Sequence, residues 1–296
     1  MVTPTYGKGV DAATYENPVN ATYNMIEKVA TQILAETAIT DRLARFDKQP
    51  IDNGTTIEEY TVKLAQSTAF DPADENPFKK ADPAIVARYY KDWTRKKFRT
   101  TVNFNEARKV TLAGESVAPL AAEVVASTTK GDIYEKYTNI RDMFGDAVTK
   151  DYIVKQAEIV KTDYKGILKA IKDTVSGMSF ANADFNKAGI IRETPKDRIT
   201  ILMPYKIKNA IDVEELAGVF NLSKAEIANR IVEIDKGDNI YICDDRAVLV
   251  YTRLYEMRSI ENTETLDRNY VLHTDRLYAI SELFDATVIP LKEAQA

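Results

Sequence analysis

Apolar residues recur along the chain in blocks whose spacing changes from alternating to helical. In residues 56–70, apolar and polar side chains alternate, which predicts a strand. Residues 89–102, YYKDWTRKKFRTTV, are rich in aromatic and β-branched residues and predict a second strand. The intervening residues 71–83 carry three prolines and charges of both signs, which predicts a loop. Residues 56–102 are therefore expected to form a long β-hairpin with a proline-rich tip.

Helical spacing dominates on either side of this predicted hairpin. Before it, apolar residues recur every three or four positions from Ile26 to about Phe46, which predicts an amphipathic helix after an irregular N-terminal arm. After it, a stripe of apolar residues from about residue 116 to residue 147 predicts a long helix, with Gly131 as the position of a bend.

The last half of the sequence alternates short helices and strands. Residues 163–178 predict an amphipathic helix, and further helices are expected at 212–220 and after Ser223 as N-cap. The predicted strands are residues 152–160, 198–204, 230–235, 239–245, 247–262 and 268–291. The fold class is therefore α+β, with strand pairings between segments that are far apart in the sequence.

Composition restricts the kind of protein and the kind of site. The chain has 296 residues, of which 45% are hydrophobic and 29% charged, as in an ordinary soluble globular protein, and its polar N-terminus lacks the apolar core of a signal peptide. The net charge of −5 argues against a protein whose whole surface binds nucleic acid. Residues 89–101 nevertheless carry five cations and one anion, so any basic site is local.

No catalytic, cofactor or metal site is predicted. With one cysteine, Cys243, and one histidine, His273, the chain cannot build a cluster of Cys and His ligands. Asp244 and Asp245 follow a predicted strand and could hold a divalent ion. A solvated turn between two strands is the simpler interpretation of this acidic pair.

The aromatic and cationic stretch at 89–102 allows three interpretations: a single-strand nucleic-acid surface, a structural ribbon, or a contact with another protein. A long ribbon with a stiff tip reaches outward, which favours protein contact. Acidic residues on the first strand are also expected to stabilise the ribbon beside the basic second strand. The candidate contact residues are Glu58, Glu59, Tyr60, Lys79, Lys80, Tyr89, Trp93, Arg95, Lys97 and Arg99.

The order of predicted elements resembles that of the major capsid proteins of tailed bacteriophages, which share the Hong Kong 97-type fold. The resemblance is closest to the phi-29 group of small podoviruses. It is strongest over residues 204–291, in YKIKNAIDVEELAGVFNLSKAEIANRIVEID and in AVLVYTRLYEMRSIENTETLDRNYVLHTDRLYAISELFDATVIPL. A weaker likeness covers TIEEYTVKL, the basic second strand and the helix near 120–140.

The resemblance implies a division of the chain and a function. It implies an N-terminal arm and helix (1–54), an extension loop (55–103) that lies across a neighbouring subunit, a peripheral domain with a long spine helix (104–179 and 246–296), and an axial domain (180–245). The implied protein is no enzyme and needs no cofactor. It assembles in the host cytoplasm into pentamers and hexamers of an icosahedral virion shell around double-stranded DNA.

The implied partners are further copies of the chain, a scaffolding protein, a portal and minor capsid proteins, without sequence-specific DNA binding and without a membrane. Other interpretations stay open at this point. An encapsulin-like shell would enclose protein cargo, a single-strand nucleic-acid-binding protein would act as a monomer, and a metal-dependent enzyme would use Asp244 and Asp245.

Overall fold

The structure is a computed structural model, and its described part consists of residues 41–52, 54–67, 82–102, 117–211, 230–262, 264 and 267–293. The predicted N-terminal arm with most of its helix, the proline-rich tip and the helices within 212–229 lie outside the described residues. The chain forms two compact units. Unit 1 contains Asp41 and the described residues of Arg95–Lys136 and Tyr255–Thr274, and unit 2 contains those of Arg42–Thr94, Tyr137–Leu254 and Asp275–Ala296.

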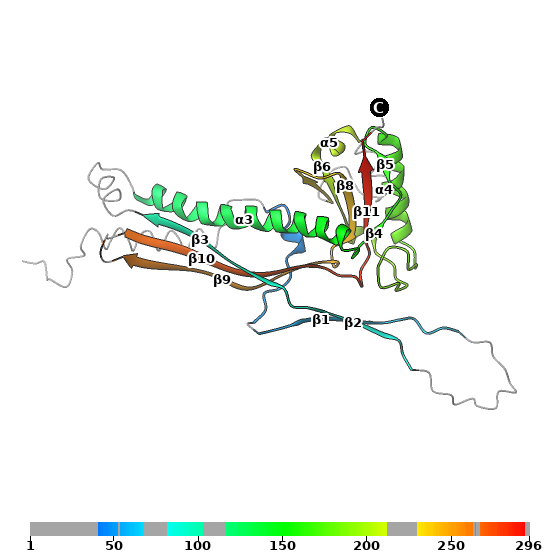
Figure 1. Cartoon of the computed structure of the whole chain (residues 1–296), viewed down its shortest axis with the longest axis horizontal. Helices are drawn as coiled ribbons and strands as arrows, with labels where there is room; N and C mark the ends of the chain where they lie inside the picture. Colours follow the sequence, from blue (N-terminus) through cyan, green and yellow to red (C-terminus); the bar gives the residue numbers. More distant parts are fainter. Residues whose placement is uncertain are drawn as a thin grey trace, which may run out of the picture. The chain divides into compact units, whose positions relative to one another are not determined.

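Figure 1 labels most of the helices and strands. The elements are η1 (Ala44–Phe46), β1 (Ile57–Val62), β2 (Ile85–Tyr90), β3 (Trp93–Val102), α3 (Val117–Thr149), β4 (Val154–Lys155), β5 (Ile159–Val160), α4 (Tyr164–Met178), η2 (Lys196–Arg198), β6 (Ile199–Pro204), α5 (Tyr205–Ala210), β7 (Ile231–Ile234), β8 (Asn239–Asp244), β9 (Val248–Asn262), β10 (Asp267–Ile280) and β11 (Ala286–Lys292). Among the described residues, no helix has the length and apolarity that crossing a membrane requires.

Unit 2 is built on a six-stranded mixed sheet in the order β4-β11-β8-β6-β7, with β5 also paired to β11. Strand β8 runs antiparallel to both β6 and β11, whereas β6 and β7 are parallel. All six residues of β6 are buried, because both faces of the sheet are covered. One face packs on α4 through residues such as Ile201 and Ile171, and the other packs on the end of α3 through residues such as Leu202 and Phe144.

Helix α4 begins and ends close to the predicted residues, and its apolar stripe faces the sheet. The Asp163 side chain caps the helix by accepting a hydrogen bond of 2.9 Å from the Gly166 N–H. Apolar residues then recur at helical spacing and are buried at Ile167, Ile171 and Val175. The helix therefore exists because one apolar stripe can cover the sheet.

Unit 1 contains the first part of α3 and the strand ends of β3, β10 and β9, which form a three-stranded sheet in that order. Helix α3 continues through Gly131, and the predicted role of this residue as a bend is replaced by a packing role. A Cβ atom at position 131 would lie 3.2 Å from Cδ1 of Phe98, so glycine lets β3 approach the helix closely. Beside this contact, Lys96 Nζ lies 3.1 Å from Glu135 Oε1.

The predicted long hairpin over 56–102 is wrong in its second half. The antiparallel ribbon pairs only β1 with β2. Lys91 and Asp92 interrupt the second strand, and β3 then joins β10 and β9 in a different sheet. The sequence does not reveal that the strand changes sheets, because the aromatic and β-branched pattern continues across the interruption. The predicted strand at 152–160 likewise divides into β4 and β5, which pair with successive residues of β11.

Candidate assembly surface

The β1–β2 ribbon carries an apolar face that points away from its own unit. In the register of the two strands, Glu58 lies opposite Tyr89, Tyr60 opposite Ala87, and Val62 opposite Ile85. Side chains alternate between the two faces of a ribbon, so these residues share one face. We call this the outer face, and its members are Glu58, Tyr60, Val62, Ile85, Ala87 and Tyr89. The exposed fraction is 73% for Tyr60, 62% for Ile85, 60% for Tyr89 and 51% for Val62.

The opposite face of the ribbon, the inner face, packs on unit 2. Ile57 is buried against Leu249 and Leu277, and Tyr90 and Trp93 pack against the same cluster. The guanidinium of Arg253 lies over the Trp93 ring, 4.4 Å from its centroid. Apolar packing therefore fixes the base of the ribbon on one side only.

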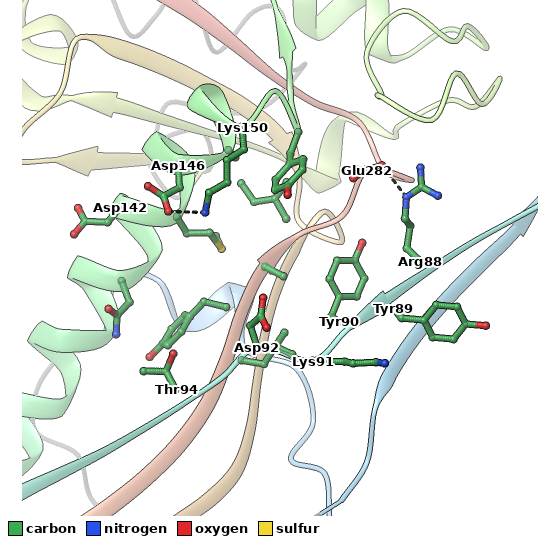
Figure 2. Close-up of a pocket in the computed structure, with 18 residues that line it drawn as sticks. Arg88, Tyr89, Tyr90, Lys91, Asp92, Thr94, Asp142, Asp146, Lys150 and Glu282 are labelled. Atoms are coloured by element: carbon green, nitrogen blue, oxygen red, sulfur yellow. Dashed lines mark hydrogen bonds and ion pairs between the residues drawn. The ribbon is translucent and has the colours of Figure 1, made fainter.

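Two polar contacts reinforce this packing at the end of β10. Glu59 Oε2 accepts hydrogen bonds from the Ser281 hydroxyl at 2.6 Å and from the Tyr90 hydroxyl at 3.1 Å. Arg88 Nε donates to Glu282 Oε2 at 2.7 Å, as Figure 2 shows. Burial, together with the Glu59 carboxylate, raises the pKa of Tyr90, so this hydroxyl stays protonated as a donor. The inner face thereby holds the outer face in a fixed orientation.

The two adjacent glutamates have different roles, as the alternation of the strand requires. Glu58 lies on the outer face, where it accepts a hydrogen bond of 3.0 Å from the Tyr89 hydroxyl and thereby raises the pKa of Tyr89. The prediction that acidic residues of the first strand pair with basic residues of the second strand is wrong. Arg88 lies opposite Glu59 in register but binds Glu282. Lys91 lies in the interruption, and the remaining cations of the stretch lie in β3, beside β10.

The candidate residues lie on the ribbon, on β3, or outside the described residues. Tyr60, Tyr89 and Glu58 lie on the outer face, and Glu59 lies on the inner face. Arg95, Lys97 and Arg99 alternate along β3 in unit 1 and are exposed, whereas Trp93 is half-buried and packs within its own chain. Lys79 and Lys80 lie outside the described residues.

Sequence reasoning missed the outer face as a surface, together with its members Val62 and Ile85. The sequence predicts a loop up to residue 83 and a second strand that begins at Tyr89, so this prediction leaves Ile85 outside both strands. The signal was present in the sequence: apolar residues at alternate positions from Tyr60 to Leu64 match alternate positions from Ile85 to Tyr89. Leu64, just beyond β1, is also exposed.

Asp244 ends β8 and Asp245 begins the turn to β9, as predicted, but the pair is neither solvated nor an open carboxylate site. Asp244 is fully buried, and its two oxygens each lie 3.0 Å from Arg246 Nε. Asp245 lies 3.5 Å from Arg230 and 3.8 Å from Arg45, and burial raises its pKa. Within the described part of the chain, no group of three or more His, Cys, Asp and Glu side chains could hold a metal ion. The two aspartates therefore form ion pairs within the β8–β9 turn and between this turn and Arg230 and Arg45.

The fold defines the class of the protein. It is the Hong Kong 97-type fold of phage capsid proteins, as comparison with solved structures shows. A capsid structure of Staphylococcus phage Andhra matches with a TM-score of 0.68 and 14% identity, over 87% of this chain and 85% of that chain. A chain in a structure of bacteriophage P68 matches with a TM-score of 0.62 and 16% identity, over 82% of both chains.

The chain belongs to the family of phi29-like phage major capsid proteins, whose family model matches residues 6–289. The major capsid protein of Bacillus phage GA-1 is 20% identical over 279 residues, which are 89% of this chain and 59% of that protein. The major capsid protein of Bacillus phage PZA is 16% identical over 89% of this chain and 61% of that protein. The chain thus spans about three fifths of the length of these relatives. The resemblance found in the sequence is confirmed.

Proposed function

We propose that this chain is a phage major capsid protein that assembles with copies of itself into pentamers and hexamers of an icosahedral shell around double-stranded DNA. One observation carries the proposal: the ribbon is fixed through its inner face while four large apolar side chains of its outer face remain in water. Soluble monomers rarely leave a contiguous apolar patch exposed, and such a patch marks a site of protein contact. A shell subunit buries the patch against its neighbour.

The proposed contact gives each part of the chain a place in the shell. Residues 55–103 serve as an extension loop that lies across the adjacent subunit, and α3 serves as the spine helix of a peripheral domain formed by 104–179 and 246–296. Residues 180–245 form the axial domain. Arg95, Lys97 and Arg99 add charge complementarity, since the chain as a whole is acidic with a net charge of −5.

Further partners are proposed from family membership: a scaffolding protein, a portal and minor capsid proteins, during assembly in the host cytoplasm. The overall negative charge favours a shell that encloses DNA without binding particular sequences, because the wall and the phosphate backbone repel each other.

The test replaces one outer-face residue and follows assembly. Ile85→Glu places a charge on the outer face, and we expect it to prevent shells or rings while changing the free energy of unfolding by no more than about 0.5 kcal/mol. The matched control is Ile260→Glu in β9, because both isoleucines are 62% exposed. Negative-stain microscopy and sedimentation, with and without a co-expressed scaffolding protein, measure the outcome.

Two results would contradict the proposal. If the wild-type chain stayed monomeric under every condition, the proposed capsid function would be wrong. Shells that contain protein cargo and no nuclease-resistant DNA would instead identify an encapsulin-like compartment. Normal assembly of Ile85→Glu would remove the outer face from the contact, and the proposed function would then rest on family membership alone.

A further inference from the structure

Helix α4 carries a line of lysines on the side that is turned away from the sheet. Its buried residues, such as Ile167 and Ile171, pack on the six-stranded sheet. Lys165, Lys169 and Lys172 follow one another at i, i+4 and i+7, which places them on one stripe, well away from the buried residues. Lys165 and Lys169 are exposed, and Lys172 is half-buried. We call these three residues the lysine stripe.

The lysine stripe is a local excess of positive charge in an acidic chain. Asp173 is the single acidic residue within α4. Within the described part of the chain, Lys165 and Lys169 form no ion pair. Residues 161–208, which include α4, carry ten cations and five anions, whereas the rest of the chain carries 30 cations and 40 anions. The positive charge of α4 is therefore concentrated, and two of its three lysines are free to meet an anion from outside the chain.

The helix on the other face of the same sheet has the opposite charge. Residues 137–149, the part of α3 that belongs to unit 2, contain one cation, Arg141, and two anions, Asp142 and Asp146. Arg141 is neutralised within the chain, because it lies 2.9 Å from Asp142 and 3.1 Å from Asp235. Unit 2 therefore has a basic helix on one face of its sheet and an acidic helix end on the other.

The composition of the lysine stripe favours a phosphate backbone over a protein surface as its partner. The cores of protein interfaces are depleted in lysine and enriched in aromatic residues. The outer face of the ribbon has exposed aromatic residues, whereas α4 exposes no large apolar side chain between Lys165 and Lys172. A lysine ammonium binds phosphate as a point charge on a flexible stem. Double-stranded DNA offers one negative charge for about every 1.7 Å of its axis, so a stripe about 10 Å long meets several phosphates.

We propose that the lysine stripe of α4 contacts the phosphate backbone of the enclosed double-stranded DNA, an inference that rests on the proposed shell function. Contacts to phosphates carry no base information, so the contact is independent of DNA sequence. The net charge of −5 makes the chain as a whole repel DNA, and the stripe is a local exception to this repulsion. Three cations in each copy hold DNA weakly, and added salt weakens the contact further.

The salt dependence of DNA binding by the full, unassembled chain tests the stripe. Lys165→Gln, Lys169→Gln and Lys172→Gln together should reduce the slope of log K against log salt concentration by about 2.7, because each phosphate contact contributes about 0.9. The matched control carries three substitutions of exposed cations on β3: Arg95→Gln, Lys97→Gln and Arg99→Gln. This control should keep the wild-type slope. An unchanged slope for the α4 variant, or an equal reduction in both variants, would overturn the proposal.

Crosslinking in wild-type particles filled with DNA gives a second, independent measurement. Formaldehyde joins lysine amines to nearby bases, and mass spectrometry then identifies the linked peptides. We expect DNA adducts on peptides from residues 164–178, and adducts confined to other peptides would contradict the proposal. If the α4 variant bound DNA normally but formed no shells, the stripe would be a protein contact and the proposal would be wrong. Wild-type particles without nuclease-resistant DNA would instead contradict the proposed function itself, and this inference with it.

Discussion

The six-stranded sheet and the β1–β2 ribbon of unit 2 are both rich in apolar residues, but they bury them differently. In β6 every residue is buried. In β1 buried or half-buried residues alternate with exposed ones, beginning at Ile57. The difference separates apolar residues that stabilise the fold from apolar residues that the fold leaves exposed, which we propose to contact another copy.

The number of covering layers explains the difference. The six-stranded sheet has one apolar cluster on each face, formed with α4 and with the end of α3. Among the described residues, the apolar cluster of the ribbon, around Ile57 and Leu277, lies on its inner face. A ribbon of two strands is marginal alone in water, so its inner face and the Glu59 and Arg88 contacts must hold it in place. The exposed outer face makes no comparable contribution to the stability of the chain.

The largest effect is expected in the sheet. Ile201→Ala removes a fully buried side chain of β6 and should lower the free energy of unfolding by about 2–5 kcal/mol, because it leaves a cavity between the sheet and α4. Chemical denaturation of unassembled chains measures it. Ile85→Ala on the outer face is the control and should change the value by about 0.5 kcal/mol or less. Similar losses for both variants would abolish the distinction between the two regions.

A smaller effect should separate the two faces of the ribbon itself. Glu59→Ala leaves the Tyr90 hydroxyl and the buried Ser281 hydroxyl without this acceptor, which should cost about 1–3 kcal/mol. Glu58→Ala is the matched control, because the adjacent glutamate only bonds the exposed Tyr89. Denaturation and hydrogen exchange of the amides of β1 measure both variants. If Glu58→Ala proved the more damaging change, the assignment of inner and outer faces would be reversed.

The sequence predicted most elements because their apolar spacing is local. Helices α3 and α4 and strands β6 and β8 lie where the periodicity placed them. The interruption at Lys91–Asp92 was not predictable, because it depends on β10 offering an edge to β3, and that pairing joins distant segments. Packing of Trp93 within its own chain is not predictable from the sequence for the same reason. Its neighbours Leu249 and Leu277 become visible only in three dimensions.

The sequence placed two exposed aromatic residues of the candidate surface, and the protein contact itself stays a prediction. Aromatic and charged residues near 89–102 indicated a protein contact, and the residues Tyr60 and Tyr89 do lie exposed together on one face. The buried state of Asp244 could not be inferred, since it depends on contacts with Thr194 and Asp285, which lie far away in the sequence. Alternation alone does not tell which of two faces the rest of the chain will cover.

The smallest effect on the fold, combined with a large effect on assembly, is expected from the three exposed cations of β3. Arg95→Glu, Lys97→Glu and Arg99→Glu together should change the free energy of unfolding by only about 0.5 kcal/mol each, because exposed charges contribute little. Assembly should fail, since a shell repeats each contact. Even about 1 kcal/mol lost per contact lowers each association constant roughly fivefold.

The control for this triple variant is Lys96→Glu, which lies between the three cations in sequence but faces α3 through Glu135. It should lose one partly exposed ion pair, worth about 1 kcal/mol or less, and still assemble. Sedimentation and microscopy follow assembly, and a DNA-binding assay at two salt concentrations is run in parallel. If the triple variant forms normal shells but loses salt-sensitive DNA affinity, β3 is a nucleic-acid surface, and the subunit contact rests on the apolar outer face alone.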